Sequence, residues 1–442
     1  MDKDSSTSRA LQVPSNRISR FGRLGGMTAN IAGNMAVNGL AQLGQGQRPS
    51  MRNLLLTPRN IGRVAEQLAQ MRGAAMKIGQ LVSMDTGEVL PPELAQIMAR
   101  LRDDAHFMPP NQLKQVLSAG WGDAWLGSFR NFNVRPIAAA SIGQVHRATL
   151  KDGRDLAIKV QYPGVAKSID SDVANVGALM RLSGLLPKGF ELAPYLDEAR
   201  KQLHEETDYA LEAQQMQRFA QLLEGREDFI VPEFYLDFST PDILAMSFVE
   251  GAPIESLMDQ PQATRDHVAQ TLIKLTLEEL FDFGFMQTDP NFANYRYNYQ
   301  SQKIVLLDFG ATRQIDPVIA DQYMRLLQAG LAGDTARLTD LGVEIGFFTA
   351  DTDPAHRTQI LEMMQLVFLA IKNHRPYDFV TNDLSAQMQQ RGMALAESGF
   401  VPPPLPLDIL LLQRKFGGIF LLAKRLGAQV DLMACLDAHL TR

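Results

Sequence analysis

Three polar side chains near residue 300 have the types and spacing that phosphoryl transfer requires. Asp289 lies five residues before Asn294, and Asp308 follows the apolar run 304–307 as the first residue of an Asp-Phe-Gly sequence. Phosphoryl transfer needs a divalent metal held against phosphate oxygens and a carboxylate that orients the attacking oxygen. We therefore predict that Asn294 and Asp308 bind metal and that Asp289 is the catalytic carboxylate. An isolated Asp-Phe-Gly more often marks a turn, so the prediction depends on the combined spacing.

The alternating pattern after residue 134 predicts a β-hairpin that carries a phosphate-binding lysine. The strands are expected over residues 142–150 and 155–160, with a turn at the Asp-Gly pair 152–153. The second strand contains Leu-Ala-Ile-Lys ending at Lys159. This matches the Val-Ala-Ile-Lys strand of kinases, whose lysine binds the α- and β-phosphates of ATP.

Alanines stand where a kinase would have a glycine-rich loop over the nucleotide phosphates. The run is Ala138, Ala139, Ala140 and Ser141. Because alanine carries a Cβ, a positive φ is costly and the loop has less freedom over a ligand. We predict that these four residues bind nucleotide, and a plain turn of the hairpin is the alternative interpretation.

Lys159 needs a carboxylate partner on a following helix to be held against phosphates. One helix is predicted over residues 196–223, and it offers Glu205, Glu206, Asp208 and Glu212. Asp208 and Glu212 are one turn apart and share a face. One acid can therefore pair with Lys159 while another pairs with a different cation, for which Lys77 is the candidate. Each acid is otherwise a solvated helix charge.

Two further groups are candidates for the site. Lys77 and Gln80 share one face of a helix predicted over residues 59–82, where they reach a phosphate or carboxylate or are simply solvated. The run 243–251 reads as a strand and a kinase-like hinge. Its main-chain groups at Ser247, Phe248 and Val249 are expected to bind adenine.

Composition excludes several classes of protein. The formal net charge is −6, which gives no reason to expect nucleic acid as a partner. The single cysteine, Cys435, excludes an intrachain disulfide, and the seven histidines show no metal-ligand spacing. The apolar run 409–423 is interrupted by Arg414 and Lys415, so no membrane span is expected there.

The leader differs in charge from the rest of the chain. From residue 5 to residue 65 every charged residue is arginine. This asymmetry is typical of a tail attracted to an anionic surface, although a solvated leader is the alternative. The first residues do not resemble a secretory signal.

Several blocks together resemble the UbiB/ADCK family of atypical kinase-like proteins, and above all its members that support ubiquinone biosynthesis. The blocks are Lys-x-Gly-Gln at 77–80, the alanine run with Ser-Ile-Gly-Gln-Val at 138–145, Lys-Val-Gln-Tyr-Pro-Gly-Val at 159–165, Glu-x-Asp at 206–208, Gln-Thr-Asp-Pro-Asn at 287–291 and Leu-Asp-Phe-Gly-Ala-Thr-Arg at 307–313. The resemblance covers roughly residues 55–435.

The resemblance implies an α+β, bilobal protein-kinase-like fold with an N-terminal helical extension packed over the active site. The expected segments are a leader (1–58), the extension (59–133), an N-lobe (134–250) and a C-lobe (251–442). Glu212 is implied as the partner of Lys159. The regulatory element of the extension is implied to comprise Lys77, Gln80, Glu206 and Asp208.

The resemblance also implies binding of ATP or ADP with Mg²⁺, an ATPase activity, and an alanine-rich loop that disfavours phosphorylation of proteins in trans. Expected partners are a quinone-precursor lipid or an anionic membrane surface, together with ubiquinone-biosynthesis enzymes. We expect a cytoplasmic protein attached peripherally to the inner face of the cell membrane. Alternatives to an ATPase are a small-molecule or lipid kinase, and a nucleotide-binding scaffold or lipid chaperone with little turnover.

Overall fold

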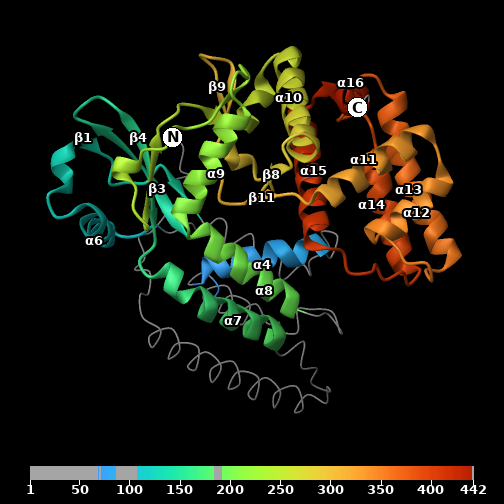
Figure 1. Cartoon of the computed structure of the whole chain (residues 1–442), viewed down its shortest axis with the longest axis horizontal. Coiled ribbons are helices and arrows are strands. Elements are labelled where there is room, and N and C mark those ends of the chain that lie inside the picture. The colour runs from blue at the N-terminus through green and yellow to red at the C-terminus, as the bar shows by residue number, and fades with distance from the viewer. Residues whose placement is uncertain (1–67, 69–70, 86–106, 141, 184–191, 441–442) are drawn as a thin grey trace, which may run out of the picture. The chain divides into compact units, whose positions relative to one another are not determined.

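The computed structural model describes residue 68 and residues 71–85, 107–140, 142–183 and 192–440. The chain divides into two compact units, and it first passes from one to the other inside helix α9 (Tyr209–Leu222). The helix is labelled in Figure 1. The first unit contains the described residues up to Gln217 together with Pro232–Val249. The second contains Arg218–Val231 and the described residues from Glu250 onward. The leader, residues 1–58, lies outside the described residues.

The first unit is built on an antiparallel sheet with the strand order β1-β3-β4-β6, and β2 pairs with β3. The strands are β1 (Phe129–Phe132), β2 (Ala138–Ala139), β3 (Gly143–Leu150), β4 (Asp155–Gln161) and β6 (Ile243–Ser247). The predicted hairpin is confirmed, because β3 and β4 pair from Gly143 opposite Gln161 to Thr149 opposite Asp155. Gly153 in the turn has φ 96°, which glycine adopts without strain.

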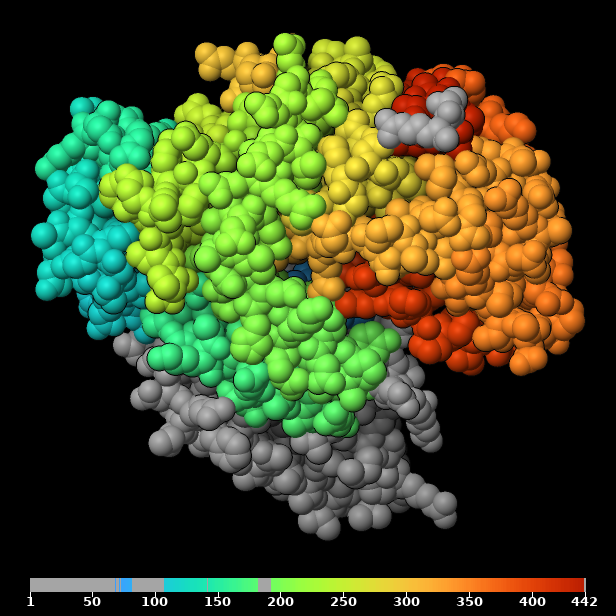
Figure 2. All heavy atoms as spheres, in the orientation of Figure 1, coloured from blue at the N-terminus to red at the C-terminus, as the bar shows by residue number. Residues whose placement is uncertain are grey.

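Helices cover this sheet and extend from it. They are α4 (Arg72–Asp85), α6 (Pro110–Trp121), α7 (Val165–Ser183), α8 (Ala193–Glu206) and the first part of α9, with short 3₁₀ segments η1 (Trp125–Ser128) and η2 (Leu236–Phe238). Leu113 and Leu117 of α6 pack on buried sheet residues such as Ile158. Helix α4 packs against α7 and α8, and the space-filling view shows α7 and α8 side by side in green (Figure 2).

The single helix predicted over residues 196–223 is wrong, because the chain forms two helices that break at Thr207 and Asp208. The Gln161 side chain donates a hydrogen bond to the Thr207 carbonyl (2.6 Å). The Asp208 carboxylate accepts one from the Leu211 amide (3.0 Å), which caps α9. A contact from strand β4 and a local cap therefore end one helix and begin the next.

A buried histidine in the first sheet has a single protonation pattern. His146 Nδ1 lies 2.7 Å from the Asn133 carbonyl, which only accepts, so Nδ1 carries the hydrogen. Nε2 then accepts from Gln144 (2.8 Å), whose own amide oxygen accepts from the Met108 amide (2.8 Å). Burial lowers the pKa of His146, and the bond to Asn133 opposes this. A proton on Nε2 would place a donor against a donor.

We expect this pattern to make the first unit less stable in acid. Below about pH 6.5 His146 is protonated in the unfolded state and neutral in the folded state. The free energy of unfolding therefore decreases as the pH is lowered, by up to about 1.4 kcal/mol per pH unit, until the lowered pKa of the folded state is reached. His146→Gln should show a smaller loss between pH 7.5 and 5. The measurement is denaturant unfolding followed by tryptophan fluorescence, since both tryptophans of the chain, Trp121 and Trp125, lie in this unit. Parallel pH curves for the two proteins would contradict the assignment.

The second unit begins with short strands whose pairing places two loops together. The strands are β5 (Phe229–Ile230), β7 (Ala252–Pro253), β8 (Phe285–Gln287), β9 (Tyr295–Asn298), β10 (Lys303–Leu306), β11 (Thr312–Gln314), β12 (Tyr377–Asp378) and β13 (Gln429–Val430), with 3₁₀ segments η3 (Ile254–Asp259) and η4 (Phe292–Asn294). Strand β8 pairs with β11, and β9 pairs with β10. The loop from β8 to β9 begins at one of these strand pairs and ends at the other, and so does the loop from β10 to β11. The pairing therefore brings the two loops together.

Helices make up the rest of the second unit. They are α10 (Gln262–Phe281), α11 (Pro317–Ala332), α12 (Thr335–Ile345), α13 (Pro354–Asn373), α14 (Leu384–Glu397), α15 (Leu407–Leu426) and α16 (Leu432–Leu440). Helix α10 packs against α15 and α16. Leu412 of α15 shares a core with Met286 of β8 and Ile315. Within the part of the chain that the structure describes, no helix has the length and apolar character needed to cross a membrane.

Candidate active site

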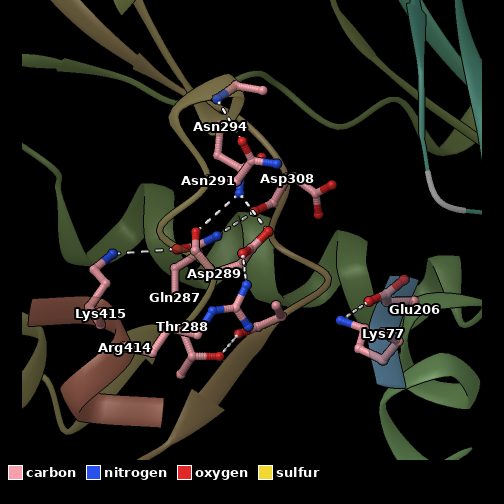
Figure 3. A network of polar contacts seen from close by, with 12 residues as sticks. Lys77, Glu206, Gln287, Thr288, Asp289, Asn291, Asn294, Asp308, Arg414 and Lys415 are labelled. Carbon is pink, nitrogen blue, oxygen red and sulfur yellow. Dashed lines mark hydrogen bonds and ion pairs between the residues drawn. The ribbon is translucent and has the colours of Figure 1, made fainter. Parts of the chain in front are cut away.

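The carboxylate of Asp289 is held on both of its oxygens (Figure 3). Arg414 of α15 donates to Oδ1 at 2.7 Å, and the side-chain amide of Asn294 donates to Oδ2 at 3.2 Å. Asn294 also donates to the Asp289 carbonyl at 3.1 Å. Two donors on opposite oxygens fix the plane of the carboxylate, as a group that orients an attacking oxygen requires.

The loop that carries Asp308 is joined to the loop that carries Asp289. The Thr288 amide and hydroxyl both donate to the Ala311 carbonyl, at 3.0 and 2.7 Å, and the Leu307 amide donates to the Asn294 carbonyl at 2.8 Å. Asp308 has φ 60°, a left-handed conformation that is uncommon outside glycine and is adopted mainly by asparagine, aspartate and histidine. Its Oδ1 accepts from the Gly310 amide at 3.2 Å.

The next residue anchors this loop in the core. Phe309 is buried, and its ring lies 5.3 Å from that of Phe219, which in turn lies 5.6 Å from Phe285. The Asp308 side chain is exposed, whereas Asn294 is buried. The buried Phe309 ring therefore anchors the loop beside Asp308, whose backbone is left-handed and whose side chain is exposed.

Asn294 and Asp308 fit a magnesium ion. The Asn294 side-chain nitrogen is used by Asp289, which leaves its amide oxygen as a ligand, and Asp308 supplies carboxylate oxygen. Mg²⁺ prefers oxygen ligands, and protein sites for it commonly offer one or two carboxylates together with substrate phosphates. The donor set is thus of the right chemical type.

A buried charge network underlies the catalytic loop, and the sequence did not reveal it. Lys415 Nζ lies 3.2 Å from Glu279 Oε2, and it donates to the Tyr295 hydroxyl (3.0 Å) and the Gln287 amide oxygen (3.4 Å). The Lys415 and Glu279 side chains are 2% and 1% exposed, so water does not screen them. Burial opposes the charged ammonium, but Glu279 and Tyr295 outweigh it and raise the pKa of Lys415.

In the first unit, the two lysines predicted for the site, Lys159 and Lys77, form ion pairs with different acids. Lys159 Nζ lies 2.8 and 2.9 Å from the two carboxylate oxygens of Glu212, and the two side chains are 9% and 2% exposed. Lys77 forms an ion pair with Glu206, which Figure 3 also draws. Spacing along a helix had left the pairing open, whereas the family resemblance implied Glu212 as the partner of Lys159, which is the pairing found here.

The other two residues of the predicted regulatory element, Gln80 and Asp208, lie close in sequence to Lys77 and Glu206. Gln80 is half-buried on α4, three residues after Lys77. Asp208 is exposed and caps α9. The ion pair from α4 to α8 and the cap of α9 thus belong to neighbouring helices of one unit.

The alanine run is partly a strand. Ala138 pairs with Val145 and Ala139 with Gln144, and Ala140 donates its amide to the Gly143 carbonyl at 2.8 Å. Ser141 lies outside the described residues. Ala138, Ala139 and Ala140 are therefore hydrogen-bonded or paired to β3, and that the run is a stiff loop over nucleotide stays a prediction.

The expected hinge already uses two of its amides. The Ser247 amide donates to the Glu233 carbonyl and the Phe248 amide to the Asp155 carbonyl, both at 2.8 Å. The Phe248 ring lies under the Arg147 guanidinium, 3.9 Å away. Two of the predicted adenine-binding groups, the Ser247 and Phe248 amides, therefore already have protein partners, and adenine binding by the main chain of 247–249 stays a prediction.

Comparison with known proteins identifies the family. Residues 100–341 match the ABC1 atypical kinase-like domain, which is more than half of the chain. The chain belongs to this family. The resemblance stated from sequence motifs is confirmed, and so is the kinase-like fold of mixed helices and sheets. That the extension packs over the active site stays a prediction.

Relatives of this ABC1-family chain match nearly its whole length. It is 36% identical to "Atypical kinase COQ8, mitochondrial" of Saccharomyces cerevisiae over 96% of this chain and 85% of that protein. It is 35% identical to the rat "Atypical kinase COQ8B, mitochondrial", over 98% and 81%. With "Atypical kinase coq-8, mitochondrial" of Caenorhabditis elegans the identity is 36% over 95% of this chain, which spans 56% of that protein.

A solved structure shares the fold. The Mycobacterium tuberculosis protein Rv3197, solved in complex with erythromycin, has a TM-score of 0.61 and 23% identity, over 84% of this chain and 93% of that one.

Arg414 and Lys415 lie after the matched domain, which ends at residue 341. A signal for them existed in the sequence, namely two adjacent cations inside an otherwise apolar helical run.

Proposed function

We propose that the chain is an atypical kinase-like, magnesium-dependent ATPase that binds ATP and ADP and supports ubiquinone biosynthesis. The observation that carries the proposal is the joined pair of loops, in which Asp289 is fixed on both oxygens beside Asn294 and Asp308. A protein that only bound nucleotide would have no need of an oriented carboxylate. The names of the COQ8 relatives support the atypical-kinase assignment.

Each residue has a distinct role in this proposal. Lys159, fixed by Glu212, anchors the α- and β-phosphates, and the alanine run and hinge hold the nucleotide. Asn294 and Asp308 hold Mg²⁺, which when bound neutralises charge on the phosphates. Asp289 orients the attacking oxygen and accepts its proton. The pair Lys77 and Glu206, with Gln80 and Asp208, forms the regulatory element of the extension.

We also propose that the reaction takes place at a membrane surface on the cytoplasmic side. The support is the arginine-only charge of residues 5–65 in a chain of net charge −6. Such a segment gains attraction from anionic lipid, about 1 kcal/mol for each arginine near the surface. The substrate or stimulus is then a quinone-precursor lipid, or the enzymes that modify one.

The test is phosphate release from ATP, with and without Mg²⁺, anionic liposomes and a ubiquinone-precursor mimic. Asp289→Asn serves as the inactive control. Magnesium-dependent release that rises with the liposomes and disappears in the control is the expected result. A phosphorylated lipid instead of free phosphate would make the protein a lipid kinase. Bound ATP without turnover under every condition would leave a nucleotide-binding scaffold.

A further inference from the structure

We propose that Arg414 is a positioning residue for Asp289, and that residues 408–418 of helix α15 support the catalytic loop although they lie outside the matched family domain. The inference rests on the proposed function, since it gives Asp289 the role of catalytic carboxylate. It adds a residue, and a segment after residue 341, that neither the family match nor the sequence motifs contain.

The first observation is that the positive charge beside Asp289 comes from a distant part of the chain. The segment 287–294 contains no lysine or arginine, so the loop supplies no cation of its own. Arg414 reaches it from 125 positions later in the chain and donates to Oδ1 at 2.7 Å. The two side chains are 19% and 25% exposed, so the pair is more shielded from water than a surface ion pair. A shielded, charge-assisted hydrogen bond holds geometry better than a solvated one.

The second observation is that α15 contacts the same loop at further points. Lys415 donates to the side-chain oxygen of Gln287, which precedes Asp289, and to the hydroxyl of Tyr295, which follows the loop. Gly418 lies against Pro290, because a Cβ added at Gly418 would come within 2.3 Å of the proline Cβ. A larger residue at 418 would push the loop away from the helix.

The helix also approaches the neighbouring metal-binding loop. Arg313, five residues after Asp308, lies with its Nη1 3.8 Å from the Oδ1 of Asp408 near the start of α15. Leu412 packs with Met286 in the strand that leads into the catalytic loop. One helix thus supports both segments that carry the site, from Asp408 to Gly418.

The geometry gives Arg414 a specific effect. With Oδ1 on the guanidinium and Oδ2 on Asn294, the carboxylate is not free to rotate about its terminal bond. Without Arg414 it is held on one side only, by a bond of 3.2 Å. A small displacement of an orienting group can cost about 10²-fold in rate. Nucleotide affinity should change little, since Arg414 is not assigned to the nucleotide.

The test is a double-mutant cycle on phosphate release. Arg414→Met, which keeps the apolar length of the side chain, is expected to lower kcat by about 10²-fold with the KM for ATP changed less than about twofold. In the Asp289→Asn background the same substitution should change the residual rate by less than about twofold, because its target is gone. Arg425→Met is the matched control, an exposed arginine on the same helix, and should turn over like the parent. Arg414→Lys should recover part of the rate.

Either a parental kcat in Arg414→Met or the same loss in both backgrounds would overturn the inference. A second measurement keeps it testable if the parent protein shows no turnover, an outcome that would refute the proposed function instead. Hydrogen exchange of a peptide spanning 287–295 should then rise in Arg414→Met and not in Arg425→Met. Equal exchange in the two variants would show that Arg414 does not hold the loop.

Discussion

Asp308→Asn is expected to abolish the magnesium dependence of nucleotide binding and to lower phosphate release by about 10³-fold. The metal contributes several kcal/mol of charge stabilisation in phosphoryl transfer, and each 1.36 kcal/mol is a factor of ten in rate. Asparagine removes the negative charge but keeps the shape. It also tolerates the left-handed backbone found here at φ 60°, so the variant should fold normally. Calorimetric titration of ATP with and without Mg²⁺ measures the effect directly.

A matched control separates this loss from a general effect of Asp-to-Asn substitution. Asp316 caps α11 through a hydrogen bond from the Val318 amide (2.9 Å), and asparagine caps a helix as well as aspartate does. Asp316→Asn should therefore bind and turn over nucleotide like the parent. If Asp308→Asn retained the parent's response to Mg²⁺, Asp308 would not be a metal ligand.

Local sequence patterns predicted the elements that carry the site. The Asp-Gly turn and the alternating pattern fixed the hairpin on which Lys159 lies, because turn type and register are decided within a few residues. The spacing from Asp289 to Asn294 also mattered locally, since the two side chains meet across one short loop. Such features need no knowledge of the rest of the fold.

Long-range contacts explain what the sequence could not predict. The helix break after Glu206 depends on Gln161, a strand residue whose side chain donates a hydrogen bond to the Thr207 carbonyl. Helical periodicity in the sequence contains no sign of this contact and therefore predicts one continuous helix. That break reorients the acids, which is why spacing on one continuous helix could not decide between Glu206 and Glu212. The alternatives are resolved only when β4 places Lys159 against α9.

The cations of α15 show the same limit. In the sequence, Arg414 and Lys415 only interrupt an apolar run. In the fold they meet residues more than 100 positions earlier, Asp289 and Tyr295. A charged pair inside an apolar helix is costly to bury, so its presence is a signal that partners exist. The identity of those partners is tertiary information.

Lys415→Met should lower the free energy of unfolding by about 3–5 kcal/mol, because it leaves the Glu279 carboxylate buried without its cation. Replacing both residues, as Lys415→Met with Glu279→Met, should restore most of this stability, since a buried ion pair is often exchanged for apolar side chains at little net cost. Urea unfolding followed by circular dichroism measures both variants. A double variant as unstable as the single one would show that the cost is lost packing and not an unpaired charge.

The double variant also separates stability from catalysis. Although its stability should be close to that of the parent, the double variant lacks the ammonium that donates to Gln287 and Tyr295 on either side of the catalytic loop. Phosphate release should therefore stay below that of the parent although the protein is folded. If the stable double variant turned over at the parental rate, Lys415 would only neutralise Glu279. Arg414 and the close contact of Gly418 with Pro290 would then be sufficient to hold the loop.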